Sequence, residues 1–189
     1  MLLKVTLSAL MCLCGLLAAG QTTGAAQPRV IKDPAEYEAY IKVVQTVNPT
    51  ERPQAAERFL YQYPNSVVKP DVLELLLLSY QQLKNEDEAV RTAERLLDCE
   101  PANLRALALV AYTYRECATR KGSNAKNCAE KASRYGEQGL NALAKVQEPP
   151  PEGMTDEEVN TLKAQVRPIF EDAARLGPPK NKNPQRKPN

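Results

Sequence analysis

Apolar and polar positions alternate with the period of an α-helix along most of the chain, and the stretch 73–83, LELLLLSYQQL, shows this best. Its large apolar residues recur at steps of three and four, at Leu73, Leu76, Leu77, Tyr80 and Leu83. This spacing places them on one face of a helix, where we expect them to be buried. Glu74 interrupts the run, which has only about half the apolar length that spans a bilayer. The pattern therefore predicts a core helix with one exposed face.

A second helical stripe follows the polar residues 85–88, which we expect to form a turn. The stripe consists of Ala89, Ala93, Leu96 and Leu97, and Pro101 terminates it. The first helix of this pair then recurs. A shift of 34 positions moves the core residues Leu73, Leu76, Leu77 and Tyr80 onto Leu107, Val110, Ala111 and Tyr114.

A 34-residue period with a helix pair in each unit resembles the tetratricopeptide repeat. In the unit 70–103, five residues occupy positions typical of that family: Leu76, Tyr80, Ala89, Leu97 and Pro101. The resemblance implies an all-α fold, a right-handed superhelix of stacked antiparallel helix pairs with a closing helix at its C-terminal end. We expect about three repeats, at 34–69, 70–103 and 104–147.

The first and third units depart from this pattern. In the first unit, the second helix is expected at 55–63, and Arg52 stands where the family has a small residue. In the third unit, a longer loop, 117–128, precedes a second helix that resumes at residue 129. Small residues follow in that helix at Ala132, Gly136 and Gly139, and we expect them to let the two helices of the unit approach closely.

The region after the repeats contains a proline-rich linker, a helix and a tail. The linker EPPPEGM covers 148–154, and Thr155 with Glu158 has the spacing of a capping box. The helix is expected at 155–176, with an apolar stripe of Val159, Leu162, Val166, Ile169 and Phe170. Pro168 lies inside it and is expected to kink or split it. Residues 177–189 are expected to form a disordered basic tail.

The N-terminal residues have the layout of a secretory signal peptide. Lys4 supplies the positive charge, residues 5–19 are apolar, and small residues near 20 and 26 offer cleavage sites. An uncleaved membrane anchor is the alternative, although the apolar run is shorter than the ~20 residues of a spanning helix. We therefore expect 1–26 to be removed and the protein to be exported, to the periplasm or the medium of a bacterium.

Three cysteines remain beyond this leader, at Cys99, Cys117 and Cys128. Export would place them in an oxidising compartment, where disulfides persist. Cys117 and Cys128 flank the expected loop and form our preferred pair. The alternative is three buried thiols that act as small hydrophobic residues.

The composition argues against catalysis. The chain has no histidine, which excludes Ser–His and Cys–His nucleophile pairs and histidine-containing metal sites. No glycine-rich phosphate loop is present, so we expect neither a cofactor nor a bound metal. Apart from the leader and the tail, the chain is mildly acidic, which does not indicate nucleic-acid binding.

The resemblance implies a concave binding face formed by the first helix of each unit. In the second unit, the ligand-facing positions of the family fall on Asp71, Glu74, Leu78, Gln81 and Gln82. In the third unit they fall on Arg105, Ala108, Tyr112, Arg115 and Glu116. Tyr112 with Arg115 is the favoured pair, because tyrosine and arginine are enriched in binding hot spots. The alternative for each position is a solvated helix face.

These observations leave three functional hypotheses. The leading one is an exported scaffold that binds a protein or peptide partner. The second is a structural protein that self-associates through its closing helix or a free cysteine. In the third, the tail, with Lys180, Lys182, Arg186 and Lys187, adheres weakly to an anionic surface.

Overall fold

The computed structural model describes residues 29–120, 122–146 and 155–177, and the regular structure in these ranges is entirely α-helical. The expected leader and linker, and the tail beyond Gly177, lie outside the described residues. The helices are α2 (Pro34–Gln45), α3 (Arg52–Gln62), α4 (Lys69–Gln82), α5 (Glu86–Cys99), α6 (Leu104–Thr119), α7 (Ala125–Lys145) and α8 (Asp156–Ala174). The predicted all-α class is confirmed. No described helix is long and apolar enough to cross a membrane.

Helices α2, α5, α6 and α8 begin where a side chain accepts from a free N–H group of the first turn. Asp33, Asn85 and Asn103 accept hydrogen bonds from the backbone N–H groups of Ala35, Glu88 and Ala106. The expected capping box is present, because the Thr155 side chain accepts from Glu158 N while the Glu158 carboxylate accepts from Thr155 N. The capping box was expected from the sequence, and the helix predicted at 155–176 begins at Asp156.

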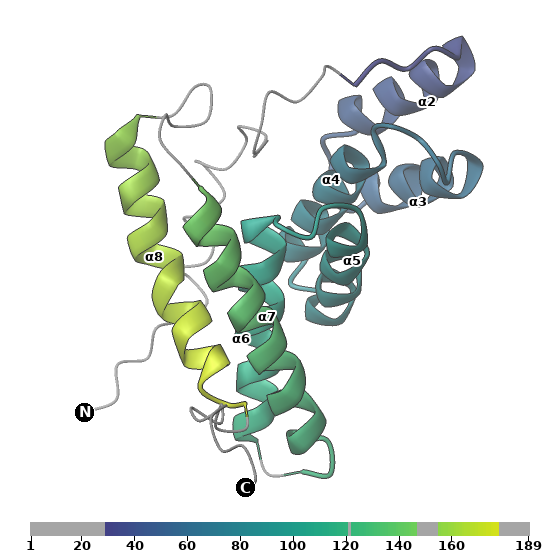
Figure 1. Ribbon diagram of the computed structural model, residues 1–189. Helices are drawn as coiled ribbons and strands as arrows, with labels where there is room; N and C mark the ends of the chain where they lie inside the picture. Colours follow the sequence, from purple (N-terminus) through teal and green to yellow (C-terminus); the bar gives the residue numbers. More distant parts are fainter. Residues whose placement is uncertain (1–28, 121, 147–154, 178–189) are drawn as a thin grey trace, which may run out of the picture.

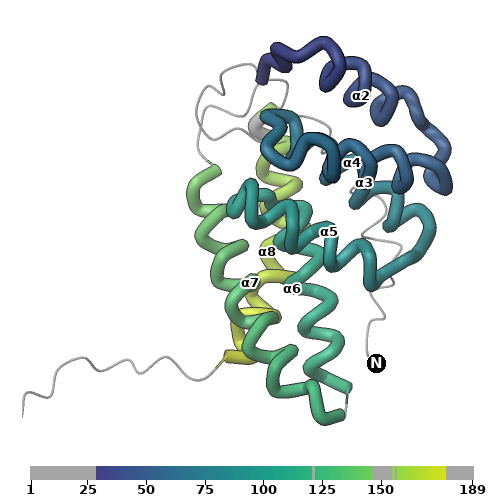
Figure 2. The backbone as a smooth tube through the Cα atoms, turned by 90° about the vertical axis from the view of Figure 1, so that its right-hand side faces the viewer, coloured from purple at the N-terminus to yellow at the C-terminus, as the bar shows by residue number. Residues whose placement is uncertain are grey.

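The helices form two groups that cross each other. Helices α6, α7 and α8 lie side by side, whereas α2 to α5 run across them (Figures 1 and 2). Helix α8 packs against both α6 and α7. Between the two groups, α5 against α6 is the one close approach of helix backbones among the described elements. The relative orientation of the groups therefore depends on the surface of α5.

The leucine-rich run forms the core of α4 as predicted, with one exception. Leu73, Leu76 and Leu77 are fully buried, and Tyr80 packs against the same core. Leu83 is 39% exposed, so its assignment to the core is wrong. The helix ends at Gln82 with Leu83 as its C-cap, and the next residue, Lys84, adopts a left-handed conformation with φ 56° that turns the chain toward α5.

The expected turn at 85–88 is also shifted. Residues 86–88 are helical and form the first turn of α5. Asn85 caps this turn, and the acidic side chains that follow interact favourably with the N-terminal end of the helix dipole. The boundary differs because a polar, charged sequence is compatible both with a turn and with the first turn of a helix.

The predicted loop 117–128 is mostly helical. Helix α6 continues to Thr119 and α7 begins at Ala125, so the connection is confined to 120–124. A disulfide joins Cys117 in α6 to Cys128 in α7, with the two Cα atoms 5.7 Å apart. This is the pair favoured by the sequence, and Cys99 is a free, half-buried thiol. The bridge fixes the ends of both helices next to the turn.

The small residues of α7 face a different neighbour from the one expected. A Cβ atom on Gly136 would lie 2.5 Å from Ala174 N, and one on Gly139 would lie 2.3 Å from the Phe170 ring. The glycines therefore allow α8, not α6, to approach α7. The expectation that these glycines bring α7 close to α6 was therefore wrong. Helix α7 has a close helical neighbour on each of two faces, and the glycines lie on the face toward α8.

Helix α8 is continuous through Pro168, so the helix is not split there (Figure 1). Proline has no backbone N–H, so the carbonyl of Ala164 lacks its usual hydrogen-bond donor within the helix. Both residues are exposed, so water can satisfy that carbonyl. On the opposite side, Val166 and Phe170 are buried and hold the helix against its neighbours. Of the predicted stripe, only Ile169 is half-buried rather than buried.

Helix α3 begins at Arg52, three residues before the expected start. The Arg52 side chain does not enter the position of a small residue. Its Nε donates to the Thr46 carbonyl at 2.7 Å, and Nη1 lies 3.4 Å from Ser79 Oγ in α4. The guanidinium therefore bridges the α2–α3 connection and α4.

Candidate binding face

The predicted face of α4 exists as a row of residues on one side of the helix. Asp71, Glu74, Leu78 and Gln81 are half-buried, and Gln82 is exposed. The steps of three and four between the first four place them in line. The structure adds partners to this row that the sequence did not indicate.

Arg29 is the first of these partners. It lies in the non-helical segment before α2, and its Nη1 donates to Asp71 Oδ1 at 2.6 Å. Its Nη2 pairs with Glu100, the residue that follows α5. One guanidinium thus joins a carboxylate from α4 to a carboxylate at the end of α5. No local pattern marks Arg29, because its partners are 42 and 71 residues away.

Asn103 completes this part of the face. Its Nδ2 donates to Glu74 Oε1 at 2.7 Å and to Glu100 Oε2 at 3.2 Å. Asp71, Glu74 and Glu100 are therefore three carboxylates held together by Arg29 and Asn103, and we call them the acidic end. Burial raises the pKa of Asp71, as does the nearby Glu100, while Arg29 opposes the shift. The acidic end carries more negative charge than Arg29 neutralises.

The rest of the α4 face is less polar. Leu78 is half-buried, and the Oε1 atom of Gln81 is buried without a hydrogen-bond partner among the described residues. Buried side-chain oxygens usually accept a hydrogen bond, so this amide is incompletely satisfied. The α4 face therefore combines an acidic end, an apolar residue and an unused acceptor.

The predicted face of α6 is largely inaccessible. Residues 103–111 are all buried, with Arg105 only 9% exposed and Ala108 at 1%. The assignment of these two residues to an open face is wrong. Helix α6 is enclosed because α5, α7 and α8 all pack against it.

The favoured pair on α6 does come together, but Arg115 also contacts α8. The Arg115 guanidinium carbon lies 5.2 Å from the centroid of the Tyr112 ring. Its Nη1 donates to Asp172 of α8 at 3.1 Å, and its Nη2 donates to Glu116 at 2.7 Å. Tyr112, Arg115 and Glu116 are half-buried. The sequence correctly paired the two side chains, but it could not show that α8 would lie beside them.

A polar cluster that the sequence did not indicate joins α5 to α6 and α7. Glu94 Oε1 accepts hydrogen bonds from Tyr114 Oη at 2.9 Å, Tyr135 Oη at 3.1 Å and Lys131 Nζ at 3.2 Å. Lys131 Nζ also donates to Tyr114 Oη at 2.8 Å, and the two tyrosine rings stack with centroids 5.9 Å apart. We call these four residues the Glu94 cluster.

The Glu94 cluster links α5 to α6 and α7 by charge-assisted hydrogen bonds. Burial opposes ionisation of Glu94, but hydrogen bonds from Tyr114 and Lys131 outweigh it and lower the pKa of the carboxyl. The hydrogen bond with Tyr114 raises the pKa of Lys131, so the amine stays protonated at neutral pH and is not a nucleophile. Within the described ranges, no three metal-binding side chains are placed to hold an ion.

Comparison with known proteins adds no relative. No protein-family model matches the chain, and neither a curated protein nor a solved structure is detectably similar to it.

Proposed function

We propose that this protein is an exported, non-catalytic scaffold of the tetratricopeptide type that binds a protein or peptide partner on the face of α4. In this proposal the pairs α2–α3, α4–α5 and α6–α7 are its three units, stacked as a right-handed superhelix, and α8 is the closing helix. Helix α8 packs against both α6 and α7, as the first helix of a further unit would. This packing supports the assignment of α8 as the closing helix. The signal-like N-terminus supports export from a bacterial cell.

The observation that carries the proposal is the position of Arg29. A non-helical segment of the chain already lies at the acidic end, with its guanidinium on Asp71 and Glu100. A peptide partner with a basic residue fits the remaining negative charge of this cluster, and Leu78 offers an apolar contact next to it. The face of α4 is favoured over that of α6, because α6 is enclosed by its neighbours.

The proposal is tested by capture followed by measured affinity. The protein is expressed from its full-length gene and immobilised, and the envelope proteins that it retains are identified and purified. We expect Leu78→Arg, which adds a bulky charge to the α4 face, to weaken binding of the identified partner at least tenfold. Tyr61→Ala, a fully exposed position on α3, is the matched control and should leave binding unchanged. Equal affinity for the wild type and Leu78→Arg would place the partner elsewhere.

The same measurement of partner affinity distinguishes binding at the face of α4 from binding at the face of α6. Tyr112→Ala with Arg115→Ala removes the contacts to α8, so we expect a loss of stability at unchanged affinity for the partner. The basic tail lies outside the described residues, and its adhesion to an anionic surface stays a prediction. Deleting 178–189 should then release the protein from the envelope fraction.

Self-association through the closing helix is not favoured. The apolar stripe of α8 is buried against its own chain, so that stripe is not free to bind a second copy. Cys99 is half-buried, which limits its use between chains.

A further inference from the structure

The segment before α2 lies against the rest of the protein through alternate side chains. Arg29 pairs with Asp71 and Glu100 of the acidic end. Ile31 packs against the hydrophobic core, whereas Val30, between the two, is 62% exposed. This alternation is typical of an extended chain that keeps one side on the protein and the other in solvent.

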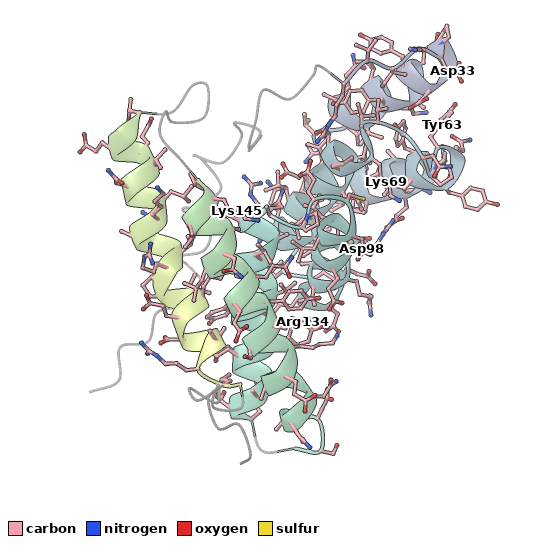
Figure 3. The ribbon with its side chains drawn as sticks, in the orientation of Figure 1. Asp33, Tyr63, Lys69, Asp98, Arg134 and Lys145 are labelled. Carbon is pink, nitrogen blue, oxygen red and sulfur yellow. A yellow bond between two sulfur atoms is a disulfide. The ribbon has the colours of Figure 1, made fainter. Side chains whose placement is uncertain are left out.

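The backbone of this segment contributes little to its position. Residues 29–32 make no backbone hydrogen bond to any described residue. Figure 3 shows Asp33, where the segment joins α2, and Lys69, the first residue of α4, in the group formed by α2 to α5. The ion pair of Arg29 is partly open to solvent, and such pairs are weak because water competes for both charges. The docking of this segment is therefore readily reversible.

The carboxylates of the acidic end are positioned without help from Arg29. Asp71 and Glu74 belong to α4, and the amide of Asn103 donates to Glu74 and to the Oε2 atom of Glu100. Arg29 uses the other oxygen of Glu100, Oε1, together with Asp71 Oδ1. A helix and an amide thus hold the acceptors, whereas a non-helical segment carries their common donor. Such an arrangement can exchange one guanidinium for another.

We propose that the segment 29–31 is a built-in competitor for the acidic end, displaced by a partner that offers a basic residue followed two positions later by an apolar one. This inference rests on the proposed function and specifies the ligand of that site. The partner's basic side chain replaces Arg29 rather than binding beside it, and its apolar side chain replaces Ile31. Before displacement, the short covalent connection keeps the segment at a high effective concentration, which weakens the apparent affinity of the partner.

The first test uses the segment itself as the ligand. A peptide with the sequence of residues 27–33, QPRVIKD, blocked at both ends and fluorescently labelled, is titrated with protein expressed from the full-length gene. Arg29→Ala with Ile31→Ala, which we call the vacated variant, removes the competitor. We expect it to bind the peptide at least tenfold more tightly than the wild type does. A peptide with glutamate in place of its arginine should bind neither protein.

Two variants that break the same ion pair separate a competitor from a structural tie. Arg29→Ala alone should tighten peptide binding, because the carboxylates remain. Asp71→Asn alone should not, because it weakens the competitor and the peptide alike. A structural tie would make the two variants behave in the same way. Adding Asp71→Asn to the vacated variant should weaken its binding about fivefold, the loss of one partly exposed ion pair.

The matched control is Arg167→Ala. Arg167 is exposed on α8 and has no hydrogen-bond or ion-pair partner among the described residues. Its replacement removes the same charge from the other helix group and should leave the affinity for the peptide unchanged. Circular dichroism checks that each variant is folded.

A spin label on the segment tests replacement directly. Val30→Cys is placed in a Cys99→Ser background, so that the label attaches at residue 30 while Cys117 and Cys128 stay bridged. Saturation with the peptide should convert the spectrum of a held segment into that of a mobile one. An unchanged spectrum with bound peptide would mean that the peptide binds beside Arg29, which overturns the proposal.

The other outcomes also decide the matter. Equal affinity of the wild type and the vacated variant, or no binding of the peptide to the vacated variant up to about 1 mM, overturns the competitor role. For a captured partner, a loss of affinity with Leu78→Arg but no gain with the vacated variant leaves the proposed function standing and ends the competitor role. If Leu78→Arg has no effect, the proposed function fails, and the peptide titration still decides whether the segment 29–31 is displaced.

Discussion

The ring of Phe170 in α8 lies against the Cα atom of Gly139 in α7, so that a methyl group at residue 139 would be 2.3 Å from the ring. One turn away, a methyl group at Gly136 would be 2.5 Å from the backbone nitrogen of Ala174. These two glycines set the distance between α7 and α8. Helix α8 can therefore approach α7 this closely because residues 136 and 139 have no side chain.

Alanine at either glycine should destabilise the protein although alanine is the better helix former. The gain in helix propensity is about 1 kcal/mol. Overpacking at Gly139 should cost about 1–3 kcal/mol, because the buried ring has to move. At Gly136 the cost should be larger, because the obstacle is backbone. Chemical denaturation measures both, and Gly122→Ala, with no atom near its Cβ position, is the matched control.

A rescue experiment makes this prediction specific. Combining Gly139→Ala with Phe170→Leu shortens the side chain that the methyl group meets, so the double variant should be more stable than additivity allows. If Gly139→Ala alone raises the midpoint of unfolding, α8 does not pack at the described distance.

Acid should weaken the contact between the two helix groups through Glu94. The pKa of this carboxyl is lowered, since the hydrogen bonds from Tyr114 and Lys131 outweigh the effect of burial. The unfolded chain has an ordinary glutamate pKa of about 4.3, so it binds the proton more readily than the folded chain. The stabilisation is therefore complete above that value and is lost as the pH falls through the folded pKa.

We expect Glu94→Gln to lower the free energy of unfolding at pH 7 and to differ less from the wild type at about pH 3. Denaturation at several pH values measures this difference. Glu130→Gln, on an exposed part of α7, controls for the change in net charge. A constant difference between Glu94→Gln and the wild type at every pH would contradict the assigned hydrogen bonds.

Replacing Pro168 with alanine should stabilise α8. Proline inside a helix costs about 3 kcal/mol relative to alanine, and this one is exposed, so no packing is lost on its removal. The new N–H can donate to the Ala164 carbonyl. We expect a gain of about 1–3 kcal/mol in thermal or chemical unfolding. No gain would indicate that the helix is interrupted at this position, as the sequence alone suggests.

Removing the disulfide should destabilise the α6–α7 hairpin. The cysteines are 11 positions apart, and a bridge over such a loop contributes about 2–4 kcal/mol by restricting the unfolded chain. Cys117→Ser with Cys128→Ser, or reduction, should lower stability by that amount, whereas Cys99→Ser should have a small effect. Alkylation and mass spectrometry of the unreduced protein should find Cys99 modified and a cross-linked peptide pair containing Cys117 and Cys128.

The sequence predicted most of the helices and only part of the candidate site. Helix periodicity and capping residues act within a few positions, so the stripes of α4 and α8 and the start of α6 were accessible from local pattern. The acidic end depends on Arg29 meeting Glu100 across 71 residues, a separation over which no local pattern operates. The family position of Arg105 on α6 predicted an open location, and this prediction was wrong because the burial of Arg105 depends on neighbouring helices.

What the sequence by itself determined is the helical class, the core stripes of α5 and α8, most of that of α4, and the favoured cysteine pair, since these follow from periodicity, caps and short spacing. What only the tertiary structure decided is which surfaces remain open. Gly136 and Gly139 face α8 rather than α6, Arg115 pairs with Asp172, and Arg105 and Ala108 of α6 are buried. The physical reason is that the exposure of a residue depends on which other elements pack against its helix. A helical stripe, in contrast, is set by the sequence of that helix alone.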